Sequence, residues 1–405
     1  MRVQKFVANL LLAASLLPPI ATCQQLEHVP RLLLTPQRLR RLRRDRERDT
    51  VRWVNFANRV QSVPDSPERG FELALYYAVS GDEGRGREAV RWAIGHPCET
   101  RQVALVLDWA STLVTSQVRQ TLERDCADPS SLNSWERERD RVFVAVEQGG
   151  DLHSAVESAW KELRPALSDV RSLRARAIYP LSELLIVVQM LEKRDLRESD
   201  PSLFTSLPKQ YLLSLTPAEV EHPDWLTHVA AFGLVALDSN LESSQFLQGW
   251  AMEDRQMLRS GPGVAYEFLW ADPYLPGIAY QNMDPWVYDP SGRLFARTGW
   301  EPTACWVAIA PGFSLHENCG PSPGRASGDN AEFGNLIAFT LKSKCATLPP
   351  RPNKQPLLLW GLKPGQQISF QRDEHHSTLA ADVSGMVMMS SDVTGKVCST
   401  RGDRQ

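Results

Sequence analysis

The segment from Gly261 to Trp300 concentrates aromatic side chains between glycines and prolines. Rings held on loops stack against the apolar faces of sugars, while polar groups at the rim meet the hydroxyls. The segment is therefore a candidate carbohydrate-binding cleft, although composition alone favours a well-packed interdomain linker. Its aromatic residues are Tyr266, Phe268, Trp270, Tyr274, Tyr280, Trp286, Tyr288, Phe295 and Trp300.

Two arginines in this segment have the spacing of an anion-binding pair. Arg293 and Arg297 lie four residues apart on a predicted strand, so they share one face. A guanidinium binds a uronate or a sulfate with two parallel hydrogen bonds. The alternative is a structural role, in which the two arginines pair with Asp284 or Asp289 across the junction.

Other candidate residues have a functional and a structural interpretation. Asp224 and His228 are four residues apart on a predicted helix and face the same side. They could meet a ligand, or they could be a helix N-cap and a buried, hydrogen-bonded histidine. Glu267 could equally be a framework carboxylate, and Tyr274 a packing or stacking residue.

Composition and charge limit the partners. The 405 residues carry a formal charge of −3 without a basic excess, which disfavours nucleic acid. An acidic substrate would have to be met by local arginines. Residues 1–23 begin with basic residues before a short apolar run, which predicts a signal peptide, with lipidation at Cys23 as the less favoured alternative. We expect a periplasmic or secreted protein without a transmembrane anchor.

Six cysteines remain once residues 1–23 are removed, an even number that suits an oxidising compartment. One pair in the helical half and two pairs in the strand-rich half are possible. No Cys or His spacing predicts a zinc site, and we expect no metal or other cofactor. The six are Cys98, Cys126, Cys305, Cys319, Cys345 and Cys398.

The hydrophobic pattern changes once along the chain. Up to about residue 260, apolar residues recur at helical spacing, and Thr35 with Pro36 predicts a capped helix start. From about Asp289, short alternating runs divided by Pro, Gly and Asp predict antiparallel strands. We expect an incomplete α/α toroid of helical hairpins over residues 24–285, with an open solenoid as the alternative. An antiparallel β-sandwich is expected over residues 286–405.

Four segments carry a resemblance to a known family. They are PRLLLTPQRLRRLR (30–43), DWLTHVAAFGLVAL (224–237), GPGVAYEFLWADPYLPG (261–277) and GRLFARTGW (292–300). In these segments the chain resembles the heparinase II/III-like polysaccharide lyases. The resemblance implies an α/α toroid followed by a β-sandwich, and cleavage of a uronic-acid polysaccharide by β-elimination.

The resemblance also implies roles for individual residues. Tyr274 takes the place of the catalytic tyrosine, which removes the proton beside the carboxylate and protonates the leaving oxygen. His228 corresponds to a histidine that binds the uronate, although Asp224 replaces its usual asparagine partner. Residues 326–339 lack the histidine that many relatives carry there, and His316 is the nearest substitute. The expected substrate contacts are Asp224, Glu267, Trp270, Tyr280, Trp286, Arg293 and Arg297.

Three functions stay open at this point. The first is a lyase acting on an acidic polysaccharide or oligosaccharide. The second is a non-catalytic carbohydrate-binding or scaffold protein on the same fold, which the missing histidine favours. The third is a toroid glycoside hydrolase, in which Glu267 would work with Asp272 or Asp284.

Overall fold

The computed structural model describes most of the chain after the predicted signal peptide. The described residues are 30–125, 133–168, 174–253, 256–288, 293–310, 313–318, 330–333, 336–340, 345–348, 357–360, 362–363, 365–372, 375–381, 386–389 and 393–399. Residues 1–23 lie outside these ranges, so the predicted signal peptide stays a prediction. Among the described residues, no helix is both long enough and apolar enough to cross a bilayer.

The first two thirds of the described chain are helical, as the sequence predicts. The helices are α1 (Pro36–Glu47), α2 (Val51–Ser62), α3 (Arg69–Ser80), α4 (Glu83–Gly95), α5 (Thr100–Trp109), α6 (Ser116–Asp125), α7 (Ser134–Gln148), α8 (Leu152–Leu163), α9 (Ala175–Glu192), α10 (Pro201–Ser214), α11 (Pro217–Glu221), α12 (Trp225–Leu237), α13 (Glu242–Ala251) and α14 (Gly263–Trp270). The predicted cap of α1 is confirmed, because the hydroxyl of Thr35 accepts the backbone N–H of Arg38 at 3.0 Å and Pro36 follows it.

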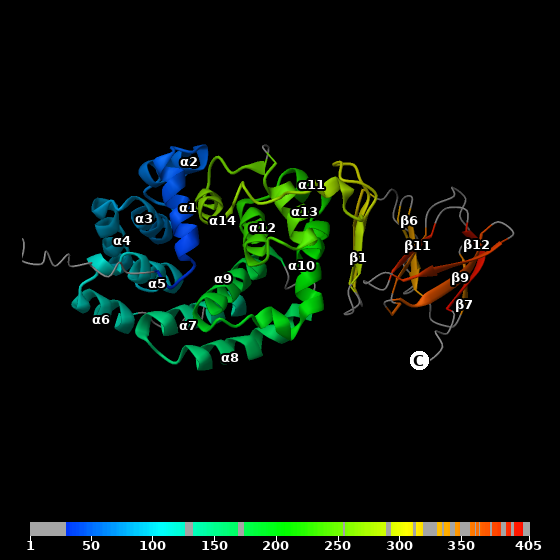
Figure 1. The fold of residues 1–405 in the computed structure, drawn as a ribbon, viewed down its shortest axis with the longest axis horizontal. Coiled ribbons are helices and arrows are strands. Elements are labelled where there is room, and N and C mark those ends of the chain that lie inside the picture. The colour runs from blue at the N-terminus through cyan, green and yellow to red at the C-terminus, as the bar shows by residue number, and fades with distance from the viewer. Residues whose placement is uncertain are drawn as a thin grey trace, which may run out of the picture.

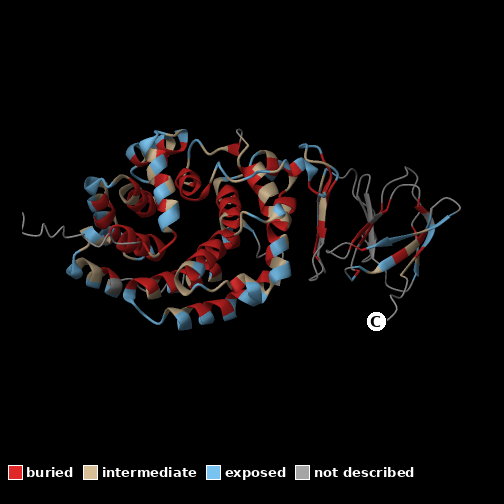
Figure 2. Ribbon diagram, viewed as in Figure 1, coloured by how far each residue is buried: buried red, intermediate tan, exposed pale blue. Residues whose placement is uncertain are grey.

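The helices form a broad assembly around the central helices α9, α12 and α14 (Figure 1). Neighbours in sequence pack together, as in α3 with α4, α7 with α8 and α12 with α13. Longer-range contacts join α9 to α12 and α14 to α2. The buried faces of these helices point inward and the exposed faces outward (Figure 2). Burial of that common apolar face stabilises the helices.

The strand-rich part contains three four-stranded sheets within the described ranges. Sheet A has the order β1-β2-β3-β4, sheet B the order β11-β8-β6-β5, and sheet C the order β10-β9-β12-β7. The strands are β1 (Trp286–Tyr288), β2 (Leu294–Arg297), β3 (Trp306–Ala310), β4 (Phe313–Glu317), β5 (Asn330–Phe333), β6 (Leu336–Thr340), β7 (Cys345–Thr347), β8 (Leu357–Trp360), β9 (Gln367–Arg372), β10 (His375–Ala380), β11 (Val387–Met389) and β12 (Val393–Ser399).

The sheets are antiparallel with one exception. Strands β6 and β8 run parallel, with Ile337 opposite Leu357. The expectation of a purely antiparallel strand-rich part is therefore wrong at this pair. A parallel pair needs a crossover between its strands, and β7, a strand of sheet C, lies between β6 and β8 in the chain.

Sheet A belongs to the helical core, although it follows the predicted boundary at residue 286. Its Val287, Phe295, Trp306 and Ala308 are part of the same hydrophobic cluster as the helices. Helix α10 contacts β1 and β2, and the indole N–H of Trp306 donates to the carbonyl of Leu213 at 2.7 Å. Sheets B and C enclose a second cluster, which contains Leu357, Ile368 and Val397 among others. Sheet A therefore lies against the helices, with the other two sheets beyond it (Figure 1).

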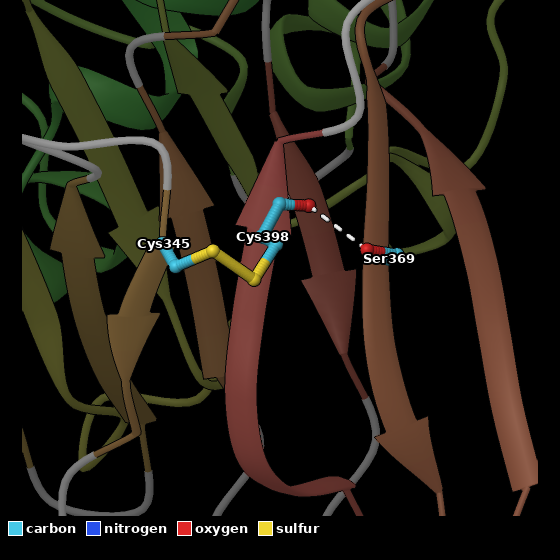
Figure 3. Close-up of a disulfide and its surroundings, with 3 residues drawn as sticks. All are labelled: Cys345, Ser369 and Cys398. Carbon is cyan, nitrogen blue, oxygen red and sulfur yellow. Dashed lines mark hydrogen bonds between the residues drawn. A yellow bond between two sulfur atoms is a disulfide. The ribbon is translucent and has the colours of Figure 1, made fainter.

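The cysteines divide between the two parts. Cys345 on β7 and Cys398 on β12 are cross-strand neighbours joined by a disulfide (Figure 3). The hydroxyl of Ser369 on β9 donates to the carbonyl of Cys398 at 3.3 Å, which adds a third strand to this contact. Cys305 is also disulfide-bonded. Cys98 is an exposed free thiol, so the helical pair that the cysteine count allowed is not formed.

Candidate functional site

A cleft of about 620 Å³ lies between the helices and sheet A. This volume is in the range of small-molecule binding sites. Helices α7, α9, α10, α11 and α12 supply one side, and strands β2, β3 and β4 supply the other. The lining residues are Asn133, Trp135, Arg174–Ala177, Leu207, Gln210, Tyr211, Ser214–Thr216, Glu219, Asp224, Leu226, Thr227, Arg293, Phe295, Trp306, Ala308 and Leu315.

Both carboxylates of the cleft serve as helix caps. Asp224 precedes α12 and accepts the backbone N–H of Thr227 at 2.7 Å. Glu219 closes a capping box at α11, where its carboxylate accepts the backbone N–H of Thr216 at 2.8 Å. The N-terminal ends of two helices thus compensate these two charges. The N-cap interpretation of Asp224 is confirmed.

Three arginines line the same cleft. Arg174 and Arg176, at the start of α9, are exposed. Burial raises the pKa of Glu136 on α7, and the positive charges of Arg139 and Arg176 oppose that rise. Arg293 is buried, and its guanidinium donates to the carbonyl of Leu167 at 3.4 Å. Three arginines against two carboxylates leave the lining of the cleft with a net charge of +1. Such a cleft attracts anions.

Aromatic rings complete the walls. Trp135, Tyr211, Phe295 and Trp306 all line the cleft. The hydroxyl of Tyr211 donates to the carbonyl of Thr227 at 2.8 Å, and burial raises the pKa of this tyrosine well above its usual value. The ring of Tyr211 is therefore fixed, and its hydroxyl stays protonated. The site combines cations with flat apolar surfaces, which suits a ligand with both acidic groups and apolar ring faces.

The residues proposed for catalysis do not meet in this cleft. The side chain of Tyr274 is 71% exposed, on the turn after α14, where its backbone N–H donates to Asp272. His228 is 1% exposed inside the helical core and stacks on Trp250 at 5.3 Å. Neither lines the cleft. His316 lies on β4 opposite Val307, and its side chain is outside the described part of the structure.

The acidic residues of the hydrolase alternative are committed to other contacts. Glu267 is buried and accepts the backbone N–H of Leu258 at 2.7 Å, and burial raises the pKa of this carboxyl. Asp272 forms an ion pair with Arg41. Asp284 lies 3.3 Å from the ammonium group of Lys209. The framework interpretation of Glu267 therefore fits the structure better than a catalytic one.

The remaining predicted contacts are scattered. Trp270 and Tyr280 are buried, and Trp286 is half-buried on β1. Of the expected substrate contacts, only Asp224 and Arg293 line the cleft. Arg297 is the last residue of β2 and does not line the cleft. Its guanidinium carbon lies 4.1 Å from the ring centre of Trp300. Of the two aspartates considered as partners of these arginines, Asp284 pairs with Lys209, and Asp289 lies outside the described residues.

Sequence reasoning missed most of the cleft. Arg174 and Arg176 belong to the segment RSLRAR (171–176), whose density of arginines was the available signal. Trp135, Tyr211 and Trp306 gave no signal, because single aromatic residues within helices and strands usually mark the core. Only the packing of sheet A against the helices brings these residues to one place.

The burial of His228 predicts a pH-dependent stability. Burial lowers the pKa of His228 to about 4, against an attraction from Asp224 and a hydrogen bond from Gln256 that raise it. Between pH 6.5 and about 4, the unfolded chain therefore binds more protons at this histidine than the folded chain does. The free energy of unfolding consequently decreases as the pH falls through this interval. The expected loss is at most about 3 kcal/mol.

Replacing His228 by asparagine should flatten this dependence of the free energy of unfolding. Urea unfolding followed by circular dichroism across the acidic range measures it. His96→Asn changes an exposed histidine and is the matched control, which should keep the wild-type slope. An unchanged slope in His228→Asn would contradict the assignment.

No protein-family model matches the chain, and a search of curated proteins finds no match either. Within the described residues, no three His, Cys, Asp or Glu side chains gather closely enough to hold a metal ion.

Proposed function

We propose that this protein binds an acidic saccharide in the cleft between the helices and sheet A. The charge balance of that cleft is the main support for this proposal. Its lining has three arginines, Arg174, Arg176 and Arg293, against two carboxylates, Asp224 and Glu219. A uronate or sulfate would balance this excess positive charge, since guanidinium groups bind such anions in bidentate fashion.

The aromatic residues of the cleft support a saccharide over a small inorganic anion. Sugar rings present apolar faces of C–H groups, and the lining of the cleft includes the apolar rings of Trp135 and Phe295, which are 5% and 6% exposed. The volume of about 620 Å³ admits more than a single small anion. Gln210 and Asn133 add polar groups that can hydrogen-bond to hydroxyls.

The proposed scaffold is that of the heparinase II/III-like lyases. The helices would form an incomplete α/α toroid, and the sheets beyond would form the sandwich. On this scaffold we favour binding over β-elimination, because the proton-transfer roles assigned by resemblance fall to an exposed Tyr274 and an enclosed His228. A base and an acid must reach the same substrate atoms within hydrogen-bonding distance.

Replacing Arg174 by alanine should weaken binding of an acidic oligosaccharide by about tenfold, the loss expected for one charge-assisted contact. Isothermal titration calorimetry with alginate and hyaluronan oligosaccharides measures this. Binding to the wild-type protein should weaken as salt is added, because exposed charges are screened.

Arg87→Ala is the matched control, since Arg87 is an exposed arginine on α4 that pairs only with the neighbouring Glu83 and lies outside the cleft. Equal loss in both variants would indicate a general charge effect and contradict the cleft as the site. Formation of an ultraviolet-absorbing unsaturated product, abolished in Tyr274→Phe, would replace the binding proposal by the lyase function.

A further inference from the structure

A second hollow lies on the other side of α11 from the cleft. Glu219 of this helix lines the cleft, and Glu221 lines the second hollow. The hollow has a volume of about 490 Å³ and opens widely to the surface. Its lining residues are Glu221, Tyr280, Gln281, Gly299, Trp300, Glu301 and Pro302. None of these residues is used in the site described above.

Trp300 is the central apolar surface of this hollow, and its ring is fixed from two directions. The guanidinium carbon of Arg297 lies 4.1 Å from the ring centre, over one face. The ring of Tyr280 meets it edge-to-face, with centroids 4.8 Å apart and planes at 89°. The indole itself is only half-buried. A rigid, partly exposed ring loses little conformational freedom when a ligand stacks on it.

Arg297 makes this arrangement unusual. It is 3% exposed, and its three guanidinium nitrogens have no hydrogen-bond partner among the described residues. Burial lowers its pKa to about 10, partly offset by Tyr280, Glu301 and Glu317. Buried charges are normally hydrogen-bonded, so a packing role alone is a poor explanation for this one. Its principal contact is the face of Trp300, which it holds in place by a cation–π interaction.

The loop that carries Trp300 is closed by several hydrogen bonds. The backbone N–H of Thr298 donates to the carbonyl of Cys305 at 2.9 Å, and the backbone N–H of Cys305 donates to the hydroxyl of Thr298 at 3.0 Å. The backbone N–H of Ala304 donates to the backbone carbonyl of Glu301 at 2.9 Å. The side chain of Asn318, directly after β4, donates to the carbonyl of Pro302 at 2.8 Å. The loop therefore presents the ring in one preformed position.

The polar groups at the rim indicate the kind of ligand. The hollow is lined by the carboxylate residues Glu221 and Glu301 and the amide Gln281, and by no basic residue. The carboxylate of Glu301 folds against Gly299, where an added Cβ would lie 2.2 Å from its oxygen. Carboxylates accept hydrogen bonds from hydroxyl groups and repel other anions. The arrangement suits a ring with apolar C–H faces and hydroxyl donors.

We propose that the hollow around Trp300 is a second saccharide-binding site, which takes a neutral sugar ring stacked on the indole. It differs from the cleft in the charge of its ligand, and it does not depend on the function proposed for the cleft. Glu301 accepts hydroxyl groups at the rim, and Arg297 is a positioning residue beneath the ring.

Fluorine NMR of the full chain labelled with fluorotryptophan tests this proposal. Cellobiose is the probe, and single Trp→Phe variants assign the resonances. The resonance of Trp300 should shift in a saturable manner. The resonance of Trp92 should not move, because this tryptophan is also half-buried but lies on α4 away from either hollow. Glu301→Gln should keep the Trp300 resonance and weaken cellobiose binding several-fold.

The same spectrum separates this proposal from the one for the cleft. Trp135 and Trp306 line the cleft and report on acidic oligosaccharides there. Absence of a cellobiose-dependent shift at Trp300 would overturn the second site and leave the cleft unaffected. Equal shifts at Trp300 and Trp92, or a larger response of Trp300 to glucuronate than to cellobiose, would also overturn it.

Discussion

Replacing Glu183 by alanine is expected to lower the free energy of unfolding by about 3–5 kcal/mol, because it leaves buried charges without their partner. Glu183 is fully buried on α9. It accepts hydrogen bonds from Arg101 on α5 at 2.6 and 3.0 Å and from Arg139 on α7 at 2.8 Å. One carboxylate thus joins three helices through two guanidinium groups.

The charges of this network depend on one another. Burial disfavours the charged form of Arg101, but the combined attraction of Glu183, Tyr266, Glu68 and Tyr179 outweighs it, and the pKa of Arg101 is raised well above its usual value. Arg101 also donates to Glu68 at 2.9 Å, and Arg139 donates to Asp140 at 2.8 Å. Removal of Glu183 therefore leaves two cations with only part of their compensation.

Urea unfolding measured by circular dichroism tests this prediction. Glu183→Gln should lie between the wild type and alanine, because an amide keeps the shape but not the charge. Glu83→Ala is the matched control, since Glu83 forms an exposed helical ion pair with Arg87 at 2.8 Å. Its expected effect is below about 1 kcal/mol. A Glu183→Ala protein as stable as this control would show that the network contributes little.

Replacing Cys345 and Cys398 by alanine is expected to destabilise sheets B and C by about 4 kcal/mol. The bond closes a loop with a sequence separation of 53, and its loss restores freedom to the unfolded chain. The helices and sheet A should be unaffected, because their hydrophobic cluster is separate. Acidic oligosaccharides should still bind in the cleft.

In denaturant unfolding, the transition of sheets B and C should move to lower denaturant concentration, and the transition of the helices and sheet A should not move. The fluorine NMR resonance of fluorotryptophan at Trp306 follows sheet A, and amide hydrogen exchange in β9 and β12 follows sheets B and C. Cys98→Ser is the control, because Cys98 is an exposed free thiol in the helical part. A single transition that shifts as a whole would instead show that the two clusters unfold together.

Much of the secondary structure follows from the sequence. The change from helical to strand periodicity near residue 289, and the cap at Thr35 with Pro36, depend on local patterns that neighbouring residues encode. The N-cap interpretation of Asp224 is of the same kind, since a cap is formed by residues three apart in the chain. The parallel pairing of β6 with β8 is not local, and periodicity does not distinguish it from an antiparallel pair.

The site was decided by packing. The cleft joins Trp135, Arg174, Tyr211 and Arg293, which come from four separate segments, so no spacing in the sequence relates them. His228 has a residue type and position compatible with chemistry, but its stacking on Trp250 encloses it. Sequence by itself determined the elements and which of their faces are apolar, because hydrogen bonding and periodicity act over a few residues. Tertiary structure decided which charges face a shared space, because burial depends on neighbours that are distant along the chain.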